Sequence, residues 1–218
     1  MAKATLNDAE LGSVIRGKIN DNFTELYDGT QFFAPISNNY FRLVDNPGFS
    51  SAGFAFGNVI YFSAFVVRRE ITISAIGAYV AAALGGANFQ VAIYACSSAG
   101  LPTSTSLAQS ANLSGATVGA VMETLGSNLT LSPGIYWFGC NSSSGAINFQ
   151  SLHPVASPVA TAMFIGTSTL GNIAGAGEIV FRGLTLSKTF GTWGDMTSES
   201  FTEVVNSWRG AAGIGRYA

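Results

Sequence analysis

The side chains that could act as acids, bases or nucleophiles are few and scattered in this 218-residue sequence. His153 is the only histidine, so a Ser-His-Asp or Cys-His site would have to use it. It lies in Leu152-His153-Pro154, a loop phrase without a nucleophile motif. A glycosidase needs a placed pair of carboxylates, and those of the central sequence stand far apart: Asp45, Glu70, Glu123 and Glu178. We therefore expect no catalytic site and no enzymatic activity.

Metal and cofactor sites have equally little support. Cys96 and Cys140 each end an apolar run, and two thiols with one histidine are too few ligands for a zinc site. A disulfide between them stays open, but free buried thiols suit a protein assembled in a cytoplasm better. The acidic residues Asp195, Glu199 and Glu203 lack the ligand density of a calcium loop and indicate a solvated face. We expect no metal and no cofactor.

Two tryptophans near the end of the chain could bind a glycan. Sugar faces stack on exposed aromatic rings, while carboxylates and amides bind hydroxyl groups. Trp193 stands beside Asp195, and Trp208 is the second candidate. The alternative is that each tryptophan is a core residue or an interface anchor.

The composition excludes several classes of protein. Charged residues make up 10% of the chain against 48% hydrophobic, and the formal net charge is -2 with a pI near 5.3. Because phosphate binding needs clustered Lys and Arg and only Arg68-Arg69 are adjacent, we expect no nucleic-acid partner. The polar first residues contain no apolar signal-peptide core. The apolar stretch 71–95 is interrupted by a turn at residues 84–88, so we expect two core strands there and no membrane insertion.

Residues 1–30 differ from the rest in their dense charge and helical periodicity. The pattern predicts a helix at about residues 7–28, beginning at the capping phrase Asn7 to Glu10 and ending at Asp28-Gly29. Such a helix is marginal alone and must pack on its own domain or on another copy; both options stay open. Its candidate attachment and oligomerisation residues are Leu11, Ile15, Ile19, Asn22, Phe23 and Leu26.

Residues 31–186 predict a β-sandwich or jelly roll, because short apolar runs rich in Val, Ile, Phe and Tyr are separated by turn phrases without intervening helices. We expect a mostly β, antiparallel fold preceded by one N-terminal α-helix. Residues 187–218 form a C-terminal extension predicted to pack on the sandwich or on a neighbouring subunit. The clearest strands are 59–67, 70–80, 89–96, 128–131, 135–140, 162–165 and 179–186.

Two phrases resemble known proteins. The stretch LGSVIRGKINDNFTELYDG at 11–29 resembles the opening helix of many tailed-phage fibre and other virion proteins, which carry an I-x-x-K-I-N-x-N-F-x-E-L-Y phrase. The stretch FQVAIYACSSAGLPTSTSLAQSANLS at 89–114, with LTLSPGIYWFGC at 129–140, resembles a β-sandwich domain of phage tail and fibre proteins. Ala92 stands where that pattern commonly has Gly. Together the two resemblances cover about half of the chain.

The resemblance implies a virion component assembled in the cytoplasm of the host bacterium. It implies a homo-oligomer, often a trimer, whose helix lies near the attachment end and whose sandwich faces outward. Partners would be other copies, other virion proteins and, for a receptor-binding protein, a host-surface glycan. A fibre or receptor-binding protein, a capsid decoration protein and a tail or baseplate adaptor all fit, because a fold does not choose among them.

Overall fold

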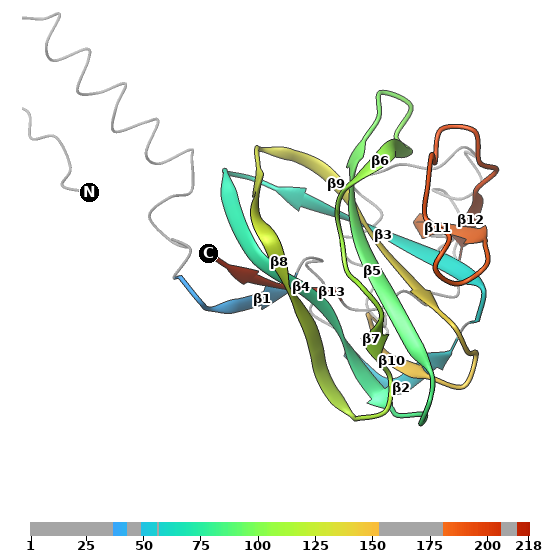
Figure 1. Ribbon diagram of the computed structural model, residues 1–218. Coiled ribbons are helices and arrows are strands. Elements are labelled where there is room, and N and C mark those ends of the chain that lie inside the picture. The colour runs from blue at the N-terminus through green and yellow to red at the C-terminus, as the bar shows by residue number, and fades with distance from the viewer. Residues whose placement is uncertain (1–36, 43–48, 56, 153–180, 206–212) are drawn as a thin grey trace, which may run out of the picture.

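The computed structural model describes residues 37–42, 49–55, 57–152, 181–205 and 213–218. Within these ranges every regular element is a β-strand, and all strand pairs are antiparallel. The strands form two sheets, which Figure 1 shows with β11 and β12 on the opposite side of the molecule from β1 and the C-terminus. For the described residues, the predicted mostly β, antiparallel, sandwich-like architecture is confirmed. The predicted helix at 7–28 lies outside the described residues.

Sheet A is built around β4, the longest of its central strands. One edge of β4 pairs with β8, and the other pairs first with β13 and then with β10. β1 extends the sheet beyond β13, and β2 extends it beyond β10. Its strands are β1 (Tyr40–Arg42), β2 (Phe49–Ala55), β4 (Ile71–Ala82), β8 (Gly119–Leu131), β10 (Asn148–Leu152) and β13 (Gly213–Tyr217).

Sheet B has the order β12-β11-β3-β9-β5-β6, with the short β7 beside β6 on the same edge of β5. Successive strands alternate between the two sheets along much of the chain, so many connections cross from one layer to the other. Its strands are β3 (Val59–Val67), β5 (Asn88–Cys96), β6 (Pro102–Gln109), β7 (Leu113–Ser114), β9 (Gly134–Ser142), β11 (Phe181–Ser187) and β12 (Thr202–Val205).

The main core lies between the sheets and follows from the two-residue period of the strands. Ile76, Ala78 and Val80 of β4 point into it from sheet A, and Val91 and Ile93 of β5 point into it from sheet B. All five side chains are fully buried. Since burying a Val or Ile side chain stabilises a fold by about 1.5–3 kcal/mol, this alternating pattern fixes the register of the sheets.

A second apolar cluster covers the outer face of sheet B. Residues 188–201, here called the covering segment, join β11 to β12 and pack Trp193, Met196 and Phe201 on that face. Trp137 of β9 points into this cluster while the next residue, Phe138, points into the main core. From Trp137 to Ser142, β9 is therefore buried on both faces.

Several strand predictions are confirmed almost to the residue. The predicted strand 59–67 is β3, and 70–80 corresponds to β4, which runs two residues further. The apolar stretch 71–95 does consist of two strands and a turn, because β5 begins after residues 83–87. The predicted strand 162–165 lies outside the described residues.

The two cysteines are both free. Cys140 pairs with Val91 across β9 and β5, which places Cys96 five residues further along β5. At about 3.3 Å per residue this separation is roughly 16 Å, far beyond the reach of a disulfide. The two side chains also belong to opposite faces, Cys140 to the main core and Cys96 to the outer cluster. The prediction of free thiols is confirmed.

Candidate functional site

The structure places two of the candidate glycan-binding residues, Trp193 and Asp195, in the covering segment. Trp208 lies outside the described residues. The six candidate residues of the helix, which are Leu11, Ile15, Ile19, Asn22, Phe23 and Leu26, also lie outside them.

Trp193 lies against sheet B and is half-buried. Its indole Nε1 donates a hydrogen bond of 2.7 Å to Oε1 of Gln90 on β5. Its ring stacks on Tyr94, with centroids 6.2 Å apart and planes inclined by 29°. Gly139 allows this approach, because a Cβ there would lie 3.0 Å from Cζ3 of Trp193. One ring face is thus used in packing, and only the remaining part of the indole is open to a ligand.

The sheet face under the covering segment carries polar groups among aromatic rings. Burial raises the pKa of Tyr94 to about 12, and the Gly194 backbone and the Ser106 hydroxyl oppose that rise. The Tyr94 hydroxyl nevertheless makes no hydrogen bond of ordinary geometry to either group. Among the described residues, Nε1 of Trp137 and Oδ1 of Asn141 also have no hydrogen-bond partner. Aromatic rings beside donors and acceptors suit a sugar, but this layer is closed to solvent.

Asp195 is fully exposed and is held by its own turn. Its carboxylate accepts hydrogen bonds from the backbone N–H of Thr197 at 2.8 Å and from the Thr197 hydroxyl. These bonds lower the pKa of Asp195, and nearby Lys188 adds a smaller effect in the same direction. Asp195 and Trp193 therefore have different partners, the first within the turn and the second on β5.

The covering segment is held at its start by Asn58, the residue before β3, and an ion pair links its two ends to each other. At its start, Asn58 accepts from the Lys188 N–H with its backbone carbonyl and from the Phe190 N–H with its side chain. Asn58 has a positive φ of 55°, which asparagine tolerates better than most residues. Towards its end, Glu199 forms an ion pair with Lys188. The candidate site is thus a layer on sheet B that has hydrogen-bond partners just before β3, on β5 and on β9.

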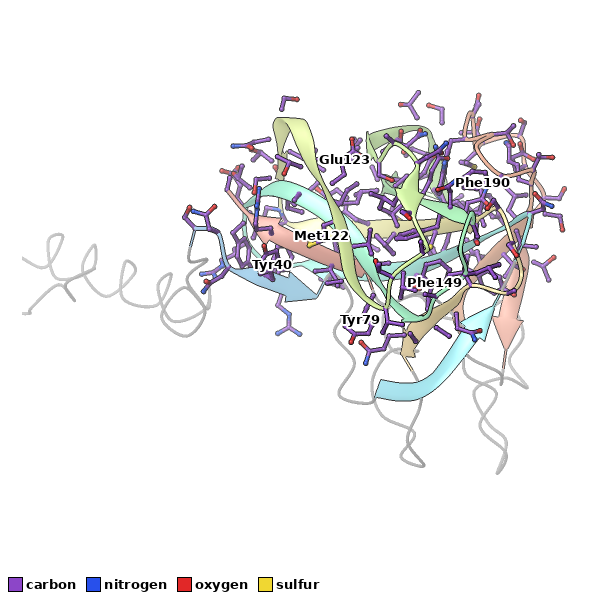
Figure 2. The ribbon with its side chains drawn as sticks, turned by 60° about the horizontal axis from the view of Figure 1, so that its bottom comes forward. Tyr40, Tyr79, Met122, Glu123, Phe149 and Phe190 are labelled. Carbon is purple, nitrogen blue, oxygen red and sulfur yellow. The ribbon has the colours of Figure 1, made fainter. Side chains whose placement is uncertain are left out.

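Glu123 is the one charged side chain between Ile71 and Gly177. It stands on β8, and its carboxylate accepts a hydrogen bond from the backbone N–H of Ala111, in the connection between β6 and β7. Figure 2 shows Glu123 on the β8 ribbon facing this region. It ties the edge of sheet A to the edge of sheet B, which is a structural role.

The described residues hold no group of three His, Cys, Asp or Glu side chains that could bind a metal. His153, the only histidine of the sequence, lies outside these ranges. Three of the described carboxylates have these partners: Glu123 accepts from a backbone N–H, Glu199 pairs with Lys188, and Asp195 closes a turn.

Sequence reasoning missed the partners of Trp193. Gln90 stands in an apolar strand where a buried amide is unusual, and its position two residues from Ala92 and four from Tyr94 places all three on one face. This spacing of two residues was the feature of the sequence that could have predicted their common face. The hydrogen bond itself could not be predicted, because residues 90 and 193 are far apart in the sequence.

No family model matches the chain, and no curated protein matches it. In the part of the chain that the structure describes, no helix is long and apolar enough to cross a membrane.

Proposed function

We propose that this chain is a non-enzymatic structural component of a tailed-phage virion. In this proposal it is an oligomeric, most simply trimeric, fibre or receptor-binding protein. Its N-terminal helix attaches it to other virion proteins, and its sandwich faces the host. The chain assembles in the bacterial cytoplasm and then resides in the particle.

The observation that carries the proposal is the pairing of two phrases in one chain. The first is the helix phrase, from Ile15 to Tyr27. The second falls on the centre of the sandwich: residues 89–114 make β5, β6 and β7, and residues 129–140 end β8 and fill most of β9. In the first of these stretches, the loop Gly100-Leu101-Pro102 begins with a glycine whose φ is 79°, a conformation that glycine adopts at no steric cost.

The strand order supports a finer assignment to the jelly-roll fold. Without the added strands, sheet A reads β2-β10-β4-β8 and sheet B reads β3-β9-β5-β6. Two four-stranded sheets in this order make an eight-stranded jelly roll, an architecture found in viral capsid and lectin domains. A fold alone does not choose a function, so this point supports the proposal without carrying it.

The experiment that tests the proposal is the copy number and position of the chain in the intact particle. Quantitative mass spectrometry of purified virions gives the number, and a low-resolution cryo-EM map of particles carrying a labelled chain gives the position. A few copies at the tail or on spikes would support the fibre. Absence of the chain from purified particles would refute a virion role altogether.

A capsid decoration protein is the second candidate, favoured by the scarcity of charge. In the described range 57–152 the charged side chains are Arg68, Arg69, Glu70 and Glu123. A neutral surface of this kind can lie against capsomers at little desolvation cost. Hundreds of copies spread over the shell would favour decoration, and a ring of copies at the neck or baseplate would favour an adaptor.

A host-surface glycan is the proposed ligand of the fibre form, with Trp193, Asp195 and Trp208 as its candidate residues. A glycan array probed with the full chain and with Trp193→Ala and Trp208→Ala tests this part separately. Binding that both variants retain at full strength would remove these residues from the site.

A further inference from the structure

We propose that residues 11–26 of this chain fold back onto the outer face of sheet A of the same subunit. The inference goes beyond the proposed function, because it concerns a contact inside one subunit before assembly. It joins a sheet face that carries the exposed Tyr40 and half-buried apolar side chains to a segment whose apolar stripe needs a surface to pack on.

The outer face of sheet A is defined by the side chains that alternate with its core residues. Tyr79 lies between the core residues Ala78 and Val80, and Met122 follows Val121, which packs on the core. Tyr40 precedes Phe41, which also packs on the core, and is 65% exposed. In Figure 2 Tyr40, Met122 and Tyr79 lie on the half of the molecule formed by sheet A, away from Phe190. The outer-face residues whose side chains the structure describes are Tyr40, Ala75, Gly77, Tyr79, Ala120, Met122, Thr124, Ile214 and Arg216.

The middle of this face is formed by glycine and apolar residues. Gly77 pairs with Ile214 on one side and with Met122 on the other, and Met122 Cγ lies 2.7 Å from where a Gly77 Cβ would stand. The charged residue of the face whose contacts are described is Arg216, which donates to Ser74 and, at 3.5 Å, to Thr124. Four strands span roughly 14 Å, enough to seat one helix of about 10 Å diameter.

The N-terminal segment has the right chemistry to cover the face. Its sequence predicts an amphipathic helix, and a helix of so few turns needs a packing partner to be stable. Residues 7–28 are acidic overall, which complements Arg216 on the face. The acidic residues are Asp8, Glu10, Asp21, Glu25 and Asp28, against Arg16 and Lys18.

The length of the connection favours the segment of the same subunit over that of another copy. The described structure begins at Ser37, and Tyr40, on β1, belongs to the outer face itself. The 13 residues between Leu26 and Tyr40 can span up to about 45 Å, so the segment reaches every part of the face. A short tether gives an effective concentration on the order of millimolar, which a second copy at micromolar concentration cannot match.

This contact would cover the stripe of Ile15, Ile19 and Phe23 in the free subunit. The same stripe is the proposed attachment surface, so a virion partner would have to displace it from sheet A. The contact therefore delays self-association until a competing partner is present.

Limited trypsin digestion of the full chain tests the contact through the cleavage sites at Arg16 and Lys18. Tyr40→Asp places a charge on the face at an exposed position and should speed cleavage at both sites at least tenfold. The matched control is Leu107→Asp on β6, where Leu107 is 44% exposed and belongs to sheet B. Circular dichroism of each variant checks that the sandwich is retained. Equal cleavage rates in wild type and Tyr40→Asp would overturn the proposal.

Cross-linking gives a second, independent measurement. In a Cys96→Ser background, Ile19→Cys is combined with Ala120→Cys on the face or with the control Ser187→Cys on sheet B, and a short bismaleimide is added at low micromolar protein concentration. We expect linkage within one chain to be at least tenfold greater for the Ala120 pair. Equal yields, or linkage only between two copies, would overturn the proposal. Neither result bears on the virion role, which the copy number decides.

Discussion

Gly77 offers the sharpest test of how sheet A is built, through the substitution Gly77→Ala. The added Cβ would lie 2.1 Å from the carbonyl oxygen of Val121 and 2.7 Å from the Cα of Met122. An ordinary Cβ contact is 3.4 Å or longer, and both atoms belong to the backbone of β8, so no side chain can rotate away. β8 would have to move away from β4 over the paired residues.

The sheet offers little room for that movement. β4 is held by β13 on its other edge, where Ile214 pairs with Gly77, and by the buried Ile76 and Ala78 on its inner face. Overpacking a well-packed site typically costs about 1–3 kcal/mol, and a clash with backbone belongs at the upper end. Since 1 kcal/mol shifts the Tm of a 150–250-residue protein by about 2–4 °C, a loss of about 3 kcal/mol lowers Tm by roughly 6–12 °C.

Urea denaturation followed by tryptophan fluorescence, together with a thermal melt, measures this loss. The matched control is Gly126→Ala on β8, where a Cβ meets no atom within 4 Å and φ is not positive. Its free energy of unfolding should stay the same or rise, because glycine in a strand interior costs about 0.5–1 kcal/mol relative to alanine. The reasoning is refuted if Gly77→Ala lies within about 0.5 kcal/mol of wild type, or if both variants lose equally.

Four further predictions concern single interactions. Glu123→Ala removes the acceptor of the Ala111 N–H and should lower the free energy of unfolding by about 1–2 kcal/mol. Hydrogen exchange of the Ala111 amide should become faster, and an unchanged exchange rate there would contradict the role given to Glu123. Trp193→Phe keeps an aromatic ring at this position but leaves Oε1 of Gln90 without its donor, so it should lower the free energy of unfolding by about 1–3 kcal/mol. In a double-mutant cycle, adding Gln90→Leu should recover most of that loss, and additive costs would argue against the hydrogen bond. The hydrogen bonds from Thr197 lower the pKa of Asp195, so the stability that this carboxylate contributes is present above its ordinary pKa of 3.8 and is lost as the pH falls through the lower folded value. Asp195→Asn should therefore flatten the dependence of stability on pH in that acid range alone. Acid titrations followed by fluorescence measure this. Burial raises the pKa of Cys140, so at pH 8 a thiol reagent should modify the half-buried Cys96 first and reach Cys140 only on unfolding; equal reaction rates in the native protein would mean that the main core opens.

The apolar strands could be predicted from the sequence because each carries its own signal. β3, β4, β5 and β9 are runs of Val, Ile, Phe and Tyr bounded by turn residues, and the structure places each of them within two residues of its predicted ends. β9 also shows its two buried faces in its aromatic sequence.

Strands without such runs were missed for physical reasons. β6 is polar in sequence, PTSTSLAQ, because it is an edge strand with much of its surface in water. β13, with the sequence GIGRY, has glycines where inward side chains are expected. A Cβ on Gly213 would lie 2.9 Å from the Phe138 ring, and one on Gly215 would lie 2.7 Å from the Phe41 ring. Neighbouring aromatic rings fill the space, so the strand itself carries no apolar alternation.

The covering segment shows the same limit at the candidate site. Its tryptophan was found from the sequence as a residue able to bind a sugar, yet the structure gives one ring face to Tyr94 and the indole nitrogen to Gln90. A residue type states which chemistry is available, whereas only the fold decides how much of that chemistry is already used within the chain. Most of the Trp193 side chain is in contact with sheet B. The proposed binding of a host-surface glycan therefore depends on the exposed remainder of the indole ring. The proposed glycan would therefore bind a ring that the hydrogen bond to Gln90 and the contact with Tyr94 already hold on β5, which favours a preformed site over one that closes around its ligand.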